Sequence, residues 1–148
     1  MREAVQAEIE ANLAEFERTG VGLSDTAAQL GRAIDEGTMA ALAGSVEFQL
    51  AEVSSAAWTS ARTSQAARLL DYEWVIEVAR AYESYAVYQR LGDRAVDAVA
   101  GMVAHGPDAD RVRELYGPIV LLTDVHVQVE ARFRTLAEDG RLPGPDGS

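Results

Sequence analysis

The sequence has no cysteine among its 148 residues, and it has only four prolines. The missing thiols exclude disulfide bonds, thiolate chemistry and cysteine-ligated zinc. A chain with so few prolines is free to form long helices. Basic residues are also scarce: 13 Lys and Arg against 24 Asp and Glu give a formal net charge of −11. Nucleic acid and anionic membrane surfaces bind through clustered positive charge, so both are poor partners for this chain.

Long apolar runs and reactive motifs are missing too. No run approaches the roughly 18 apolar residues of a membrane helix, and no signal peptide is visible. The glycines are dispersed, so they form neither a P-loop nor a dinucleotide fingerprint, and no Gly-x-Ser-x-Gly occurs. The sequence therefore predicts a chain that is not an enzyme, binds no cofactor and holds no metal. As given, it is expected to be soluble, with its compartment left open.

Helical periodicity is what the sequence does contain, and it is strongest from Leu70 to Val103. Apolar residues recur there in steps of three and four, which keeps one stripe of a helix facing its partners. The predicted stripe consists of Val75, Val78, Tyr82, Tyr85, Gln89, Gly92, Val96, Val99 and Val103. A second row widens it and consists of Trp74, Ala81, Tyr88, Ala95 and Met102. A stripe this long requires other long helices to cover it.

Two further stretches have the same spacing. The first predicts one helix from about Arg2 to Glu36, because the register continues through Gly20, and Gly37 ends it. Its apolar positions are Ile9, Leu13, Phe16, Gly20, Leu23, Ala27, Leu30 and Ile34. The other helix follows Asp108 as its N-cap and contains Pro118, where we expect a kink. Its seam consists of Val112, Leu115, Ile119, Leu122, His126, Val129, Phe133 and Leu136.

The region between the first two long helices is less regular. Val46, Phe48 and Leu50 alternate with polar residues, which indicates an extended segment that lies against the helices. Ser54 and Ser55 resemble caps for a short helix, and Asp71 resembles the cap of the next long one. That short helix carries Ala57, Trp58 and Ala61. The predicted fold is all-α: an elongated antiparallel bundle of three long helices, plus one short helix and an extended segment. Residues 1–139 form a single domain, and residues 140–148 form a disordered tail.

Three short segments carry a family resemblance. They are Glu8-Ile9-Glu10-Ala11-Asn12-Leu13, the Ala57-Trp58 pair with the later Leu69-Leu70-Asp71-Tyr72-Glu73, and Ala81-Tyr82. With them, residues 5–95 resemble the soluble helical part of an uncharacterised family of bacterial membrane-anchored proteins, a domain of unknown function with an Ala-Trp motif. The resemblance implies an anchored helical domain with a transmembrane helix just before the first long helix. It implies no catalytic residues, and this chain shows no such membrane segment.

Two groups of residues are candidates for ligand or partner binding. The first consists of Trp58, Trp74, Tyr82 and Tyr85, which line an apolar pocket between helices or else form core with a polar rim. The second consists of Ile9, Leu13 and Phe16, at the start of a seam that three helices do not fully cover. We expect the second group to form a self-association interface.

The last helix raises the question of a metal site, because His126 and Glu130 are four residues apart and Asp124 is near. A di-iron type of bundle site needs Glu-x-x-His on two helices, and this motif does not occur. A hydrogen-bonded histidine in or beside the core is therefore the favoured interpretation.

The turn at Gly106 and Pro107 folds the last two long helices against each other, so facing residues should have numbers that add to about 215. This register pairs Tyr82 with Phe133 and Gly92 with Leu122. It also places the polar Gln89 opposite His126, and we predict that these two side chains meet as a structural polar pair.

The function that the sequence favours is a non-enzymatic helical interaction or sensor-like domain. It would oligomerise with itself or dock to another helical protein. The alternative is a small-molecule-binding helical domain with an apolar pocket near Tyr82 and Tyr85. A closed pocket there would favour the ligand-binding alternative, and an exposed apolar stripe on the first helix would favour the interaction domain.

Overall fold

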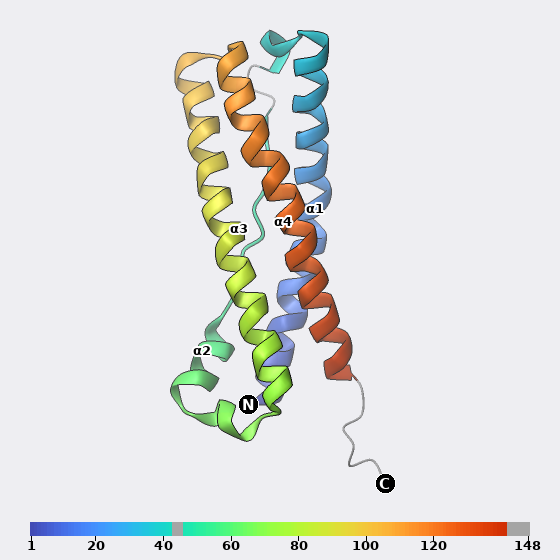
Figure 1. Cartoon of the computed structure of the whole chain (residues 1–148), viewed down its shortest axis with the longest axis vertical. Helices are drawn as coiled ribbons and strands as arrows, with labels where there is room; N and C mark the ends of the chain where they lie inside the picture. Colours follow the sequence, from blue (N-terminus) through green and yellow to red (C-terminus); the bar gives the residue numbers. More distant parts are fainter. Residues whose placement is uncertain (43–45, 142–148) are drawn as a thin grey trace.

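The structure is a computed structural model, and it describes residues 1–42 and 46–141. Four α-helices and two 3₁₀ turns are found in this part of the chain. They are α1 (Arg2–Glu36), η1 (Met39–Leu42), α2 (Ala56–Thr63), η2 (Ala66–Leu69), α3 (Tyr72–His105) and α4 (Ala109–Arg141). The described residues contain no strand, so the predicted all-α class is confirmed. The three long helices form an elongated bundle (Figure 1).

The long helices are not packed equally. The backbone of helix α4 packs closely against both α1 and α3, whereas the backbones of α1 and α3 stay further apart and these two helices meet through side chains. Residues 46–55, which we call the strap, are extended and run between α1 and α3 (Figure 1). The chain therefore goes up through α1, down through the strap, up through α3 and down through α4. This is the order of an up-down-up-down four-helix bundle in which an extended segment takes the place of the second helix.

Local sequence explains where the long helices begin and end. Gly37 adopts the left-handed conformation with φ 67°, which satisfies the last carbonyls of α1. The Asp71 carboxylate accepts the Trp74 backbone N–H at 2.9 Å, and Asp108 accepts the Arg111 N–H at the same distance. The predicted caps at these positions are confirmed. The start of α3 at Tyr72 agrees with the predicted cap, and the helix continues two residues beyond the periodic stretch to His105.

The predicted end of the last helix needs a small correction. Helix α4 passes through Gly140 and continues to Arg141, since one glycine costs only about 1 kcal/mol within a helix. Residues 142–148, which we predicted to be a disordered tail, lie outside the described residues.

The core follows the predicted seam on α4 and departs from it on α3. Every predicted core residue of α4 is buried. On α3, however, Gln89 is exposed, Val96 is 50% exposed and Val103 is 80% exposed. Val78 and Gly92 of the predicted stripe are buried, and the other buried positions belong to the neighbouring row, which consists of Trp74, Ala81, Tyr88, Ala95 and Met102. Trp74, Tyr88 and Met102 of this row bury more apolar surface than the valines of the predicted stripe would. Ala81 and Ala95 lie between them and let the helix backbones approach closely.

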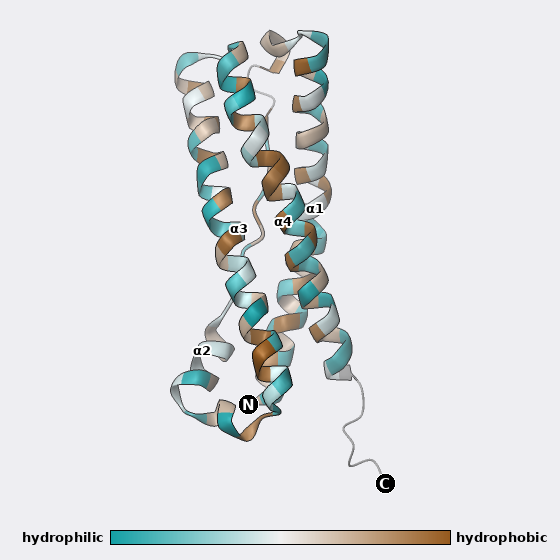
Figure 2. Cartoon of the chain, in the orientation of Figure 1, coloured by the Kyte–Doolittle hydropathy of each residue, from teal (hydrophilic) through white to brown (hydrophobic). Residues whose placement is uncertain are grey.

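The seam on α1 that we expected to be left uncovered is largely covered within the single chain. Ile9 and Phe16 are fully buried within the single chain, and Leu13 is half-buried. The strap and α2 cover the side of α1 that three helices alone would leave open. Figure 2 shows the resulting alternation of apolar and polar residues along each long helix.

Membrane-spanning helices and clusters of metal-binding side chains are both absent from the described residues. None of the helices within residues 1–42 and 46–141 combines the length and apolar character that a membrane span needs. In the same residues, His, Asp and Glu side chains do not gather in groups of three that could hold a metal ion.

Candidate functional site

The strap has no strand beside it, so side chains of the helices must satisfy its backbone polar groups. From α1, the Thr26 hydroxyl donates to the Glu47 carbonyl at 2.8 Å. From α3, the Tyr88 hydroxyl accepts the Ala51 N–H at 3.0 Å, and the Tyr85 hydroxyl accepts the Val53 N–H at 3.3 Å. These bonds replace a β-ladder.

Asn12 of α1 binds the strap most completely. Its side-chain oxygen accepts the Ser54 N–H at 2.9 Å, and its amide nitrogen donates to the Ser54 carbonyl at 2.8 Å. The same nitrogen is 3.2 Å from the Tyr82 hydroxyl. Asn12 therefore pairs with one strap residue as a neighbouring strand would, and it joins this end of the strap to α3.

The buried Glu8 carboxylate caps α2 from another helix. It accepts the backbone N–H groups of Ala57 at 2.8 Å and Trp58 at 3.1 Å. Ser55 occupies the N-cap position, but its side chain makes no capping bond. Ser54, the other predicted cap, accepts the Ala56 N–H only at 3.4 Å, so the shorter capping bonds come from Glu8, a carboxylate 47 positions before Ser55 in the chain. Sequence reasoning missed this residue because caps are sought among neighbours in the sequence.

Two more hydrogen bonds complete the surroundings of Glu8. The Tyr82 hydroxyl donates to it at 2.7 Å and the Ser54 hydroxyl at 2.9 Å. Burial raises the pKa of Glu8, but the four hydrogen bonds together outweigh burial, so its pKa is lowered from the ordinary value of 4.5. Burial, with the nearby Glu8 charge, raises the pKa of Tyr82, which keeps its hydroxyl a donor.

Trp58 fixes α2 to the bundle. Its side chain is buried, and its ring lies nearly parallel to the Tyr82 ring, with centroids 6.2 Å apart. The Arg62 guanidinium lies 6.0 Å from the Trp58 ring centroid. The other tryptophan, Trp74, is buried near the N-terminus, where the Arg2 guanidinium lies 5.3 Å from its ring.

His126 is the buried histidine that the sequence predicted, but Gln89 is not its partner. Its Nε2 donates to the Phe16 carbonyl at 2.9 Å, and its Nδ1 accepts from the Tyr88 hydroxyl at 3.4 Å. This assignment requires the neutral Nε2–H tautomer, and burial lowers the pKa of His126. The partner is one residue before Gln89 because the buried face of α3 is rotated by one residue.

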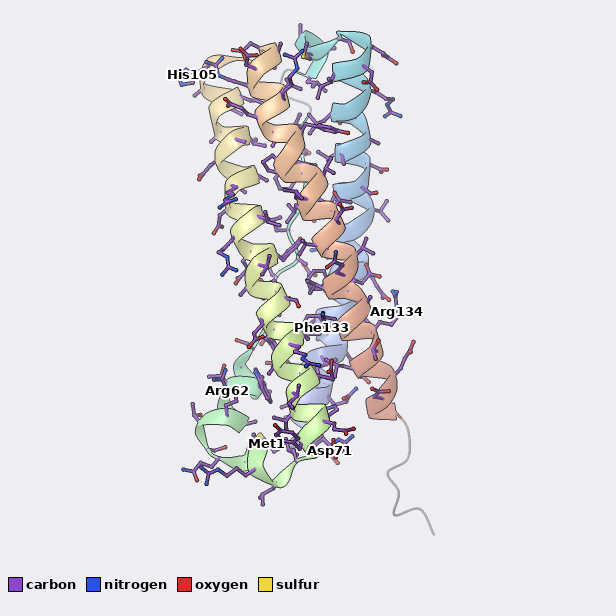
Figure 3. The ribbon with its side chains drawn as sticks, in the orientation of Figure 1. Met1, Arg62, Asp71, His105, Phe133 and Arg134 are labelled. Carbon is purple, nitrogen blue, oxygen red and sulfur yellow. The ribbon has the colours of Figure 1, made fainter. Side chains whose placement is uncertain are left out.

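Neighbouring contacts support the hairpin register and disfavour the metal alternative. The Tyr82 and Phe133 rings meet edge to face at 5.6 Å, as the sum of 215 predicted. Figure 3 shows Phe133 among the helices and Arg134 at the outer edge. Arg134 pairs with Glu130 at 2.6 Å, so this carboxylate is engaged by an arginine. Glu130 is 3.8 Å from His126 Nε2.

Gly20 and Gly92 make room for these contacts. A Cβ placed on Gly20 would lie 2.8 Å from His126 Nε2, so the histidine reaches Phe16 only because residue 20 has no side chain. A Cβ placed on Gly92 would lie 2.7 Å from the Leu50 side chain. The large residue that fills the space beside Gly92 thus comes from the strap, where we predicted one from α4.

Three grooves lie at the surface of this region. One of about 580 Å³ follows the upper strap and is lined by α1, the strap and α3. A second of about 790 Å³ follows the lower strap along α1. A third of about 440 Å³ lies between α2 and α3, where Trp58 and Tyr82 line it but Tyr85 does not. The predicted pocket near the two tyrosines is therefore a surface groove beside one of them.

The arrangement holds a segment in place. The polar atoms of Glu8, Asn12 and His126 described above are bonded to backbone and hydroxyl groups of the chain itself. No family model, curated protein or solved structure matches the chain. The resemblance to membrane-anchored bacterial proteins therefore stays a prediction.

Proposed function

We propose that the chain is a non-enzymatic interaction domain that docks another protein along its strap. An extended segment is about 5 Å wide, whereas the helix it replaces would be about 10–12 Å across. The strap therefore fills only part of the space between α1 and α3. The remaining space is the groove of about 580 Å³ along its upper half.

The observation that carries the proposal is the apolar lining of this groove. Its lining includes Val46, Phe48, Leu50, Val96 and Val99. Val96 is half-exposed, and Val103, two turns further along α3, is more exposed still. Apolar side chains gathered at a groove indicate a binding surface more strongly than apolar residues scattered singly. The docking face is thus expected on α3 and the strap, since the seam on α1 is buried.

The experiment is site-specific photo-crosslinking in cells that make the protein natively. A photoreactive residue at position 96 should capture one partner, and a residue at Leu121, which is 55% exposed on α4, is the matched control. With the purified partner, Val96→Lys should weaken binding about tenfold or more, while Leu121→Lys should leave it unchanged. Capture at both positions alike, or at 121 alone, would contradict the proposal.

A second candidate function rests on the groove beside Tyr82. Its volume of about 440 Å³ is within the range of small-molecule sites, and the aromatic side chain of Trp58 lines it. A ligand found in a thermal-shift screen of aromatic fragments should lose its effect in Ala79→Leu, which fills the floor of the groove. A ligand that still stabilises this variant binds elsewhere.

A further inference from the structure

The grooves along the upper and lower strap form one continuous path. Both are lined by Arg18, Gln49 and Leu50, where the Arg18 guanidinium donates to the Gln49 side chain at 2.7 Å. Above this point the lining includes the apolar residues Val46, Phe48, Leu50, Val96 and Val99 beside Thr19 and Glu47, and we call this part the apolar end. Below it the path is polar and is lined by Ala11, Asn12, Glu15, Glu52 and Ser54. An occupant that follows the strap therefore meets an apolar end and then a polar end.

The polar end has an excess of negative charge. Arg18 contacts Glu15 at 2.6 Å, and its side chain holds the pKa of Glu15 below its ordinary value. One cation thus stands beside two carboxylates, because Glu52 is also exposed at this end. The apolar end also has a carboxylate in its lining, because Glu47 is exposed on the strap. The whole chain has a net charge of −11, which adds a long-range attraction for cations.

We infer that this path binds a linear segment of a partner protein in which apolar residues are followed by lysine or arginine. The apolar side chains lie against Val96 and Val99, and the basic side chain lies beside Glu52. This inference rests on the proposed docking function and specifies the chemistry of the partner. A second copy of this acidic chain is a poor occupant, because like charges would meet along the path.

The test is selection of a phage library of random linear 12-residue peptides on the full-length protein. Enriched peptides should share a short apolar run next to lysine or arginine. One such peptide, made synthetically, should shift backbone NMR signals of the strap and of the segment around Val96. Its affinity should fall as salt rises, because the charged contacts are exposed.

Three variants decide between the outcomes. Val96→Lys should weaken the peptide about tenfold, and Glu52→Gln should weaken it severalfold, since each removes one half of the predicted recognition. Both side chains are exposed, so melting temperatures should stay close to that of the wild type. Leu121→Lys is the control and should not affect binding.

Several results would overturn the inference. In the selection, these are acidic or uncharged motifs, or no enriched motif at all. In the binding assay, they are an affinity that Glu52→Gln does not change and a loss of binding in Leu121→Lys. Photo-crosslinking at position 96 tests the docking function independently of the peptide selection. A partner captured there whose binding is insensitive to salt and to Glu52→Gln would leave the docking function standing and remove only this inference.

Discussion

Gly20 shows at the scale of one residue why helix propensity alone misjudges this sequence. At an exposed position in the interior of a helix, replacing glycine with alanine stabilises the helix by about 1 kcal/mol. At Gly20 the added Cβ would displace the His126 ring from the Phe16 carbonyl. The glycine that weakens α1 locally is therefore required for a contact between α1 and α4.

Gly20→Ala should destabilise the protein by about 1–3 kcal/mol through overpacking. Gly22→Ala is the matched control in the same helix, because a Cβ there meets nothing within 4 Å, and it should stabilise by up to about 1 kcal/mol. Free energies of unfolding from urea titrations compare the two variants. Equal stabilisation by both would show that His126 does not need the space.

The environment of Glu8 predicts that the free energy of unfolding depends on pH. Its pKa is lowered in the folded chain, so its contribution to stability is present above its ordinary pKa of 4.5 and is lost as pH falls through the lowered value. Glu8→Gln should cost about 1–3 kcal/mol at pH 7, because two N–H groups of α2 lose a charged acceptor. Its stability should then fall less steeply than that of wild type below pH 4.5.

Unfolding free energies at pH 7 and at several values below 4.5 test this prediction. Glu138→Gln removes one exposed carboxylate and controls for the change in net charge. Parallel acid profiles for the wild type and Glu8→Gln would mean that Glu8 does not act as the cap of α2.

Tyr88 and Gln89 provide a direct test of which face of α3 is buried. Tyr88→Phe removes the acceptor of the Ala51 N–H and the donor to His126, so it should cost about 1–3 kcal/mol. Gln89→Leu changes an exposed side chain and should stay within about 0.5 kcal/mol. Chemical denaturation of both variants gives the comparison. A larger cost for Gln89→Leu would restore the pairing that the sequence suggested.

At the scale of elements, local signals in the sequence were sufficient to predict where the long helices lie. Periodicity and caps such as Gly37, Asp71 and Asp108 depend on residues a few positions apart. The face of α3 could not be predicted, because two adjacent rows are both apolar and a rotation by one residue exchanges them. The cap from Glu8 is also invisible to local reasoning, since only the fold brings α1 to the start of α2.

The strap accounts for the remaining differences between the predicted and the observed fold. Alternation at Val46, Phe48 and Leu50 predicted an extended segment, and residues 46–55 are extended. Its role as the fourth element of the bundle was not predicted, because helical periodicity is absent there. The side chains that bind it, Asn12 and Tyr88 among them, looked like ordinary polar positions on helices.

Trp58→Ala tests how strongly α2 and the strap depend on each other. Removal of a buried tryptophan typically costs about 3–5 kcal/mol, and here it also removes the ring beside Tyr82. The melting temperature should fall by many degrees, whereas the exposed neighbour Thr59→Ala should change little. A midpoint within a degree or two of wild type would show that α2 is peripheral.

At the scale of the whole molecule, the three long helices, α2 and the strap form the core of the described residues, and the groove along the upper strap stays open. Because the seam on α1 packs within the single chain and Leu13 is half-buried, Leu13→Glu should lower the free energy of unfolding. The acidic surface opposes association of two copies, while the groove along the strap remains accessible to a partner of opposite charge.

Amide hydrogen exchange can show whether a partner docks along the strap. The full chain is compared with and without the partner captured at position 96, at equal protein concentration. Docking along the strap should add protection in the strap around residues 46–50 and in α3 around residues 92–103, with little change on the outer face of α4. Added protection around Leu121 and Val127 of α4, with an unchanged strap, would contradict it.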